Sequence, residues 1–264
     1  MTPKALLAGV ALALAAATGS IAETAAEKGE RIARAAEDAN DGFIDSSASG
    51  EMTLYSKSGE TSVRRFTSKS IEDTRDADGA NLLVFHWPGD VRNTALLTHS
   101  YDALDDDQWL YLPAIGRVKR ITSSGRSGAF LGSEFAYEDM VDQSAEEYNH
   151  LWIEDAPCPR AETTCHVIDR FPKSSSGYSR QRVWIEADTF ITHQVFYFDR
   201  GEKHLKTLEI SGHEKFPNGV YRAGFMRMEN LLSGRSTDLV WSDHEFDLGL
   251  RDRDFSTQAL KRLN

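Results

Sequence analysis

The sequence has 264 residues, and its 41 Asp and Glu against 30 Lys and Arg give a formal net charge of −11. Nucleic acid and anionic membrane surfaces repel a chain this acidic, so no nucleic-acid partner is predicted. The negative charge is that expected of an ordinary solvated, acidic surface.

The first residues are typical of a cleavable export signal. Lys4 supplies a positive start, residues 5–17 are uncharged and mostly Ala, Leu and Val, and residues 20–22 offer small side chains to a signal peptidase. The apolar run is too short for a spanning helix, which needs ~20 residues. The sequence predicts a signal peptide over 1–22, with residues 15–17 as a second candidate cleavage site. It also predicts one domain over 23–264, exported to the periplasm.

The first half of the exported chain predicts one helix followed by strands. Ile32, Ala36 and Ala39 fall on one face of a helix over residues 23–39, which ends at Asp41 and Gly42. Alternation of period two then predicts a hairpin and four further strands. These strands are expected at residues 52–57, 62–69, 82–87, 91–101, 108–112 and 117–121.

The segment after Pro113 is locally basic in an otherwise acidic chain. Its basic residues are Arg117, Lys119, Arg120 and Arg126. These residues are consistent with contact to a lipid phosphate or to an acidic patch on a partner. They are equally consistent with a solvated strand face, which is the interpretation we prefer.

The second half predicts another series of strands. Residues 141–148 are expected to be helical or irregular up to the cysteine loop, and the tail over 252–263 to include a short helix. Strands are expected at residues 179–188, 190–199, 205–216, 219–231 and 236–247. About ten consecutive strands without βαβ alternation indicate an antiparallel meander, so the fold class is mainly β with few helices.

The only two cysteines, Cys158 and Cys165, predict a structural disulfide in an oxidising compartment. The eight histidines are scattered without metal-ligand spacing, so no metal and no cofactor are predicted. No nucleophile-elbow motif is present. Glu138 and Asp139 are adjacent, so their side chains diverge, which favours a capping or salt-bridge role over acid–base catalysis.

Several strands carry bulky apolar residues on both faces, which indicates a covered or cavity-lining second face. The aromatic residues are the best binding candidates, and each fits either a packed core or the wall of an apolar cavity. They are Trp109, Tyr111, Phe130, Phe135, Tyr137, Trp184, Tyr197, Phe225 and Trp241.

Several motifs, taken in order, resemble a known family. WLYLPAIGRVKRI is followed by FLGSEFAYEDM, then by VWIEAD, and the chain ends with GRSTDLV and RDFSTQAL. This pattern is similar to the LolA-like outer-membrane lipoprotein-sorting proteins, in the branch found beside large export pumps.

The resemblance implies a curled antiparallel half-barrel whose hydrophobic cavity is covered by helices. It also implies a monomeric, non-enzymatic periplasmic carrier of lipid or lipoprotein acyl chains, with an inner-membrane export pump as a candidate partner. The alternative is a periplasmic sensor or adaptor that docks on such a pump or on a signalling protein.

Overall fold

The computed structural model describes residues 22–102 and 104–263; the predicted signal peptide, apart from Ala22, lies outside them. Among the described residues, no helix is both long and apolar enough to cross a bilayer.

The helices are α1 (Ala25–Asp38) and α2 (Thr257–Leu260), and the 3₁₀ turns are η1 (Pro113–Ile115), η2 (Ser123–Gly125), η3 (Phe130–Gly132), η4 (Tyr137–Asp139), η5 (Ala145–Glu147) and η6 (Asp252–Phe255). The strands are β1 (Asp45–Tyr55), β2 (Thr61–Ile71), β3 (Gly79–Trp87), β4 (Ala95–Ser100), β5 (Asp107–Leu112), β6 (Arg117–Ile121), β7 (Tyr148–Pro157), β8 (Thr164–Pro172), β9 (Tyr178–Glu186), β10 (Thr192–Asp199), β11 (His204–Ser211), β12 (Glu214–Lys215), β13 (Tyr221–Arg222), β14 (Phe225–Asn230) and β15 (Arg235–Phe246).

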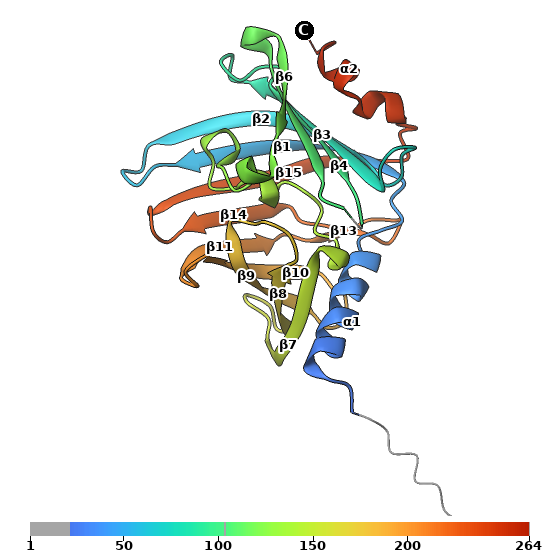
Figure 1. Ribbon diagram of the computed structural model, residues 1–264, viewed down its shortest axis with the longest axis vertical. Helices are drawn as coiled ribbons and strands as arrows, with labels where there is room; N and C mark the ends of the chain where they lie inside the picture. Colours follow the sequence, from blue (N-terminus) through green and yellow to red (C-terminus); the bar gives the residue numbers. More distant parts are fainter. Residues whose placement is uncertain (1–21, 103, 264) are drawn as a thin grey trace, which may run out of the picture.

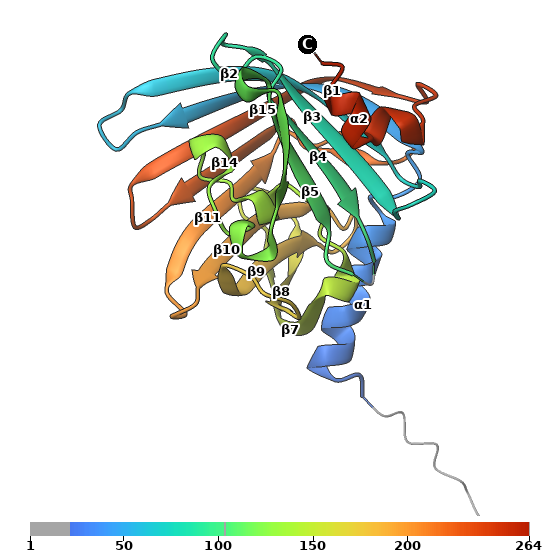
Figure 2. The ribbon, with the colours of Figure 1, turned by 45° about the horizontal axis from the view of Figure 1, so that its top comes forward.

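Thirteen strands form one open antiparallel sheet in the order β6-β5-β4-β3-β2-β1-β15-β14-β11-β10-β9-β8-β7, and β12 pairs with β13 separately. The first strand pairs with the last, with Ser46 opposite Phe246 and Tyr55 opposite Ser236, so this pair joins the two strand series. The sheet curves around α1 and the connection between β6 and β7 (Figures 1 and 2). We call residues 122–147 of that connection the inner segment.

Helix α1 lies against the edge strand β7 (Figure 1). Its start is fixed by a capping box, in which Thr24 and Glu27 each accept a hydrogen bond from the other's main-chain N–H. Close packing requires Gly29, because a Cβ there would lie 2.7 Å from the Trp152 nitrogen and 2.9 Å from the Leu151 nitrogen. The glycine therefore costs helix propensity but allows the two backbones to approach.

The inner face of the sheet holds the larger of two apolar clusters. Phe66 and Phe85 of β2 and β3 meet Phe130 of the inner segment, and Ile32 of α1 joins the same cluster. Phe130 is fully buried, with its ring centroid 5.9 Å from that of Phe85. The inner segment therefore forms part of the core at the β2–β3 end of the curve.

The outer face of β3, β4 and β5 is covered by the C-terminal tail (Figure 2). Phe255 and Leu260 pack there against Leu82, Leu97 and other apolar residues of these strands, and both are almost fully buried. His99 Nε2 lies 2.7 Å from the carbonyl oxygen of Phe255, which fixes the tail in register with β4.

Most predicted elements are present, including the first helix, the β1–β2 hairpin and the short helix in the tail. Two predictions were wrong. The count of about ten strands was too low, and residues 148–157 and 164–172, which lie around the cysteine loop, form strands β7 and β8. β7 is an edge strand that carries Asn149, Glu154 and Asp155, and polar residues of this kind hide the alternation expected of a strand.

Candidate functional site

A cavity of about 810 Å³ lies on the inner side of the sheet. Its roof is α1, which contributes Ala33 and Ala36. Alanine fills less space than a leucine or phenylalanine, so the helix covers the sheet without filling the volume beneath it. The floor is mainly aliphatic and comes from β8 to β11 and from β14: Ile168, Val183, Ile185, Val195, Leu208, Ile210 and Met226.

The mouth of the cavity is polar. It is formed by the chain that leaves α1, by the β2–β3 and β4–β5 connections, and by the end of the inner segment. Burial raises the pKa of Asp41 to about 6 and the pKa of Asp106 and of Glu147 to about 7. The cavity therefore combines an aliphatic interior with an acidic entrance.

Polar anchors hold the inner segment in the curve of the sheet. Asp139 Oδ2 accepts a hydrogen bond from the Tyr178 hydroxyl at 2.9 Å, and Lys206 Nζ lies 3.6 Å from the same oxygen. Glu138 accepts the main-chain N–H of Gly177 at 2.9 Å. Burial raises the pKa of both carboxyls. The pair expected to cap or to form salt bridges therefore makes buried structural contacts.

The curved sheet divides the nine aromatic candidates between its two faces. Five belong to the inner cluster or pack against it: Phe130, Phe135, Tyr137, Tyr197 and Trp241. Of these, Phe135 and Tyr197 also line the cavity. Phe130 and Tyr137 instead pack edge to face, with ring centroids 5.5 Å apart.

The other four aromatic candidates lie outside the cavity: Trp109, Tyr111, Trp184 and Phe225. The first two pack under the C-terminal tail in the outer cluster. Trp184 and Phe225 each adjoin a strand residue that lines the cavity, Ile185 and Met226, and neighbouring strand residues point to opposite faces. The sequence shows this alternation, but not which face encloses the cavity.

The aliphatic floor is the part of the site that was not predicted from the sequence. Val183 and Ile185, Val195 and the predicted Tyr197, and Leu208 and Ile210 alternate along the neighbouring strands β9, β10 and β11. The alternation itself is the sequence pattern that identifies the floor, since aliphatic residues with period two on consecutive strands share one face.

The predicted basic patch is not one surface. Arg117, Lys119 and Arg120 are exposed on the edge strand β6, where Arg120 pairs with Asp107. Arg126 is mostly buried and donates a hydrogen bond to the main-chain carbonyl of Asp106. Three of the four residues therefore occupy a solvated strand edge, and the fourth holds the inner segment against the β4–β5 connection.

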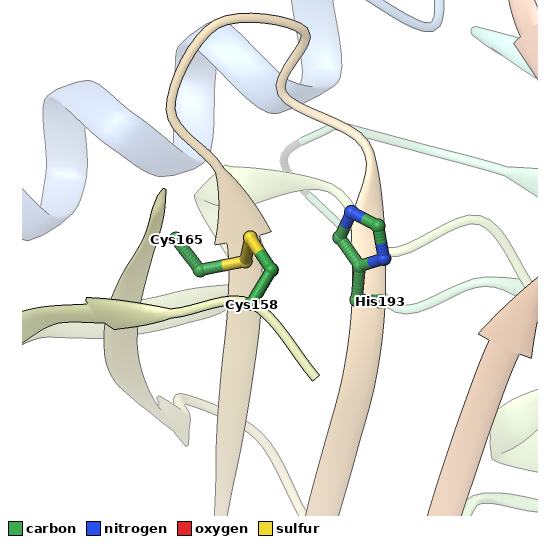
Figure 3. A group of neighbouring side chains, drawn as sticks. All are labelled: Cys158, Cys165 and His193. Carbon is green, nitrogen blue, oxygen red and sulfur yellow. A yellow bond between two sulfur atoms is a disulfide. The ribbon is translucent and has the colours of Figure 1, made fainter. Parts of the chain in front are cut away.

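The expected disulfide is present between Cys158 and Cys165, across the β7–β8 hairpin. Figure 3 shows His193 of β10 beside it. The two sulfur atoms are bonded to each other and therefore provide no thiolate for a metal ion. His193 Nε2 lies 2.8 Å from Glu186 Oε2, so its polar contact is with a carboxylate.

Comparison with known proteins agrees with this architecture. A family model described only as an uncharacterized protein matches residues 77–262, and no curated protein matches the chain. A Vibrio parahaemolyticus domain described under outer-membrane lipoprotein sorting is 38% identical, with a TM-score of 0.85, covering 90% of this chain and 100% of its own.

Two further solved structures are similar. A DUF1329 family protein from Desulfovibrio piger is 30% identical, with a TM-score of 0.84, over 90% of this chain and 99% of its own. A LolA superfamily protein from Nitrosomonas europaea shares the fold at 16% identity and a TM-score of 0.70, over 88% of this chain and 98% of its own.

The open, curved antiparallel sheet with a helix over its inner cavity defines a LolA-like fold. Within that class, the chain belongs to the family of LolA-like outer-membrane lipoprotein-sorting proteins that includes the Vibrio domain and the DUF1329 protein.

Proposed function

We propose that this protein is a periplasmic, non-enzymatic carrier that binds the acyl chain of a lipid or lipoprotein in the cavity between α1 and the sheet. The observation that carries the proposal is the cavity itself, about 810 Å³ in volume, with an aliphatic floor and a roof of alanines. That volume falls within the ~300–1,000 Å³ of ordinary ligand sites. The predicted signal peptide and the family support export to the periplasm.

Binding of this kind needs no catalytic group. Each CH₂ removed from water contributes about 0.8 kcal/mol, so a chain of about twelve carbons gains roughly 10 kcal/mol before the costs of association. The floor residues supply the required apolar surface.

Helix α1 is held by one fully buried apolar residue, Ile32, and by ion pairs. The ion pairs include Lys28 with Asp155 of β7 at 3.2 Å and Arg34 with Glu146 of the inner segment at 2.5 Å. Exposed ion pairs of this type contribute only ~0–1 kcal/mol each. Displacement of α1 would uncover the part of the cavity lined by Ala33 and Ala36, at the cost of exposing Ile32.

Neighbouring residues of β14 provide a matched test. Met226 lines the cavity, whereas Phe225 points to the other face of the sheet. We expect Met226→Trp to fill part of the cavity and to weaken binding of a fluorescent fatty-acid probe by about tenfold. Phe225→Trp leaves the affinity unchanged.

Probe titration of delipidated protein measures both affinities, with circular dichroism to show that each variant is folded. Equal affinity in the two variants would contradict chain binding in this cavity. A stable complex with a membrane protein while the cavity stays empty would favour the adaptor function instead.

A further inference from the structure

The mouth of the cavity carries a strong excess of negative charge. Nine of the residues that line the cavity are aspartate or glutamate, and two are arginine. They come from four separate parts of the chain, including the end of α1 with Asp41, the β4–β5 connection with Asp106, and the inner segment with Glu147. The acidic entrance is therefore created by the fold and not by one acidic run.

Asp106 is the least expected member of this group. The residue is only 4% exposed, and its Oδ2 is buried without a hydrogen-bond partner. Its Oδ1 accepts the main-chain N–H of Tyr101 at 3.1 Å. The nearby Arg126 donates to the main-chain carbonyl of Asp106 rather than to its carboxylate. A buried carboxylate oxygen without a donor is costly, which points to a missing cationic or hydrogen-bonding partner.

Glu147 lies in the same electrostatic neighbourhood. Within the described residues, its carboxylate has no hydrogen bond or ion pair. The charged groups that act on Asp106 and Glu147 are Arg126, Arg170, Asp105 and Asp142. Burial is the main cause that raises the pKa of both carboxyls to about 7, and the nearby acids Asp142 and Asp105 for Asp106, and Asp106 and Asp105 for Glu147, add to it.

The two arginines of the cavity are already engaged by neutral groups. Arg170 donates to Gln181 Oε1 at 2.6 Å and to Gln143 Oε1 at 3.2 Å. Arg222 donates to Asn40 Oδ1 at 2.6 Å. Both guanidinium groups therefore have hydrogen-bond partners, whereas Asp106 Oδ2 is a buried acceptor without one. An anionic head group would be repelled, because the acidic residues that line the cavity outnumber these two arginines.

We propose that the mouth of the cavity binds a cationic, ammonium-type head group of an amphiphilic cargo, through Asp106 and Glu147. This inference rests on the proposed function, since the aliphatic cavity holds the apolar chain of the same molecule. The carrier then selects its cargo at two points, by an apolar chain in the interior and by positive charge at the entrance.

Three probes with one chain length test the head-group preference: dodecyltrimethylammonium, dodecanol and dodecanoate, each below its micelle concentration. Calorimetry at pH 8 with EDTA present is expected to show the ammonium binding about tenfold more tightly than the alcohol, with dodecanoate the weakest. At pH 5.5, where Asp106 and Glu147 are protonated, the preference is expected to shrink.

The double variant Asp106→Asn/Glu147→Gln is expected to remove the preference for the ammonium and to leave the affinity for dodecanol within about twofold. The control Glu229→Gln/Glu245→Gln removes two exposed carboxylates outside the cavity and keeps the preference. If the double variant does not fold, the pH comparison on the unmodified protein tests whether the preference depends on the carboxylates of the mouth, Asp41 included.

The outcomes separate this inference from the proposed function. Equal binding of all three probes overturns the head-group site and leaves the apolar cavity intact. A preference that survives the double variant also overturns it. Binding of none of the probes contradicts the carrier function itself.

Discussion

The two faces of the sheet each carry an apolar cluster but have different coverings. On the outer face of β3 to β5, Phe255 and Leu260 of the tail fill the surface completely. On the inner face, α1 presents Ala33 and Ala36 over an aliphatic floor, and a cavity of about 810 Å³ remains. The size of the residues on the covering element, and not the aromatic content of the strands, decides which face keeps a cavity.

The largest expected effect concerns the filled outer face. Phe255→Ala removes a side chain that is 2% exposed and should lower the free energy of unfolding by about 3–5 kcal/mol. Urea denaturation measures this loss. Because the tail does not touch the cavity, fatty-acid binding by the folded variant should not change. A parallel loss of binding would show that the two faces are coupled.

A smaller effect is expected where α1 meets the edge strand. Gly29→Ala places a Cβ 2.7 Å from the Trp152 nitrogen, so α1 must shift away from β7. We expect a loss of about 1–2 kcal/mol, since overpacking exceeds the gain in helix propensity, together with a change in probe affinity. Ala26→Gly, at an exposed position of the same helix, should cost at most ~1 kcal/mol and leave binding unchanged. Unaltered binding in Gly29→Ala would mean that the position of α1 does not control the cavity.

A third effect is a dependence of stability on pH, caused by two carboxyls at the mouth of the cavity. The pKa of Asp106 and of Glu147 is about 7 in the folded protein, against about 4 in an unfolded chain. Between these values the folded state holds more protons, so the two groups reduce stability as the pH rises. Relative to the unmodified protein, Asp106→Asn/Glu147→Gln should be more stable at pH 8, by at most a few kcal/mol, and the gain should be much smaller at pH 5. Thermal unfolding at the two pH values measures the difference, and a pH-independent difference would contradict the raised pKa values.

Local patterns explain which parts of this structure were predictable. The period of two gave the β1–β2 hairpin and the strands from β9 onward, and the cysteine pair gave the disulfide. The edge strand β7 was not predicted because its polar residues, such as Glu154 and Asp155, face solvent and break the alternation.

The cavity was harder to predict because it depends on long-range packing. Trp109 and Trp184 have the composition of a ligand-binding wall, but the fold turns them to the outer face. Asp106 and Glu147 lie 41 positions apart in the sequence, and only the path of the inner segment brings them to one entrance. No local pattern carries that information.

Native mass spectrometry of the protein purified from the periplasm, without delipidation, is the decisive test of acyl-chain binding. We expect one bound molecule per chain, which organic extraction identifies as an amphiphile with an acyl chain. Protein that remains free of any such mass, and that stays free after incubation with lipid extract, would contradict the carrier function.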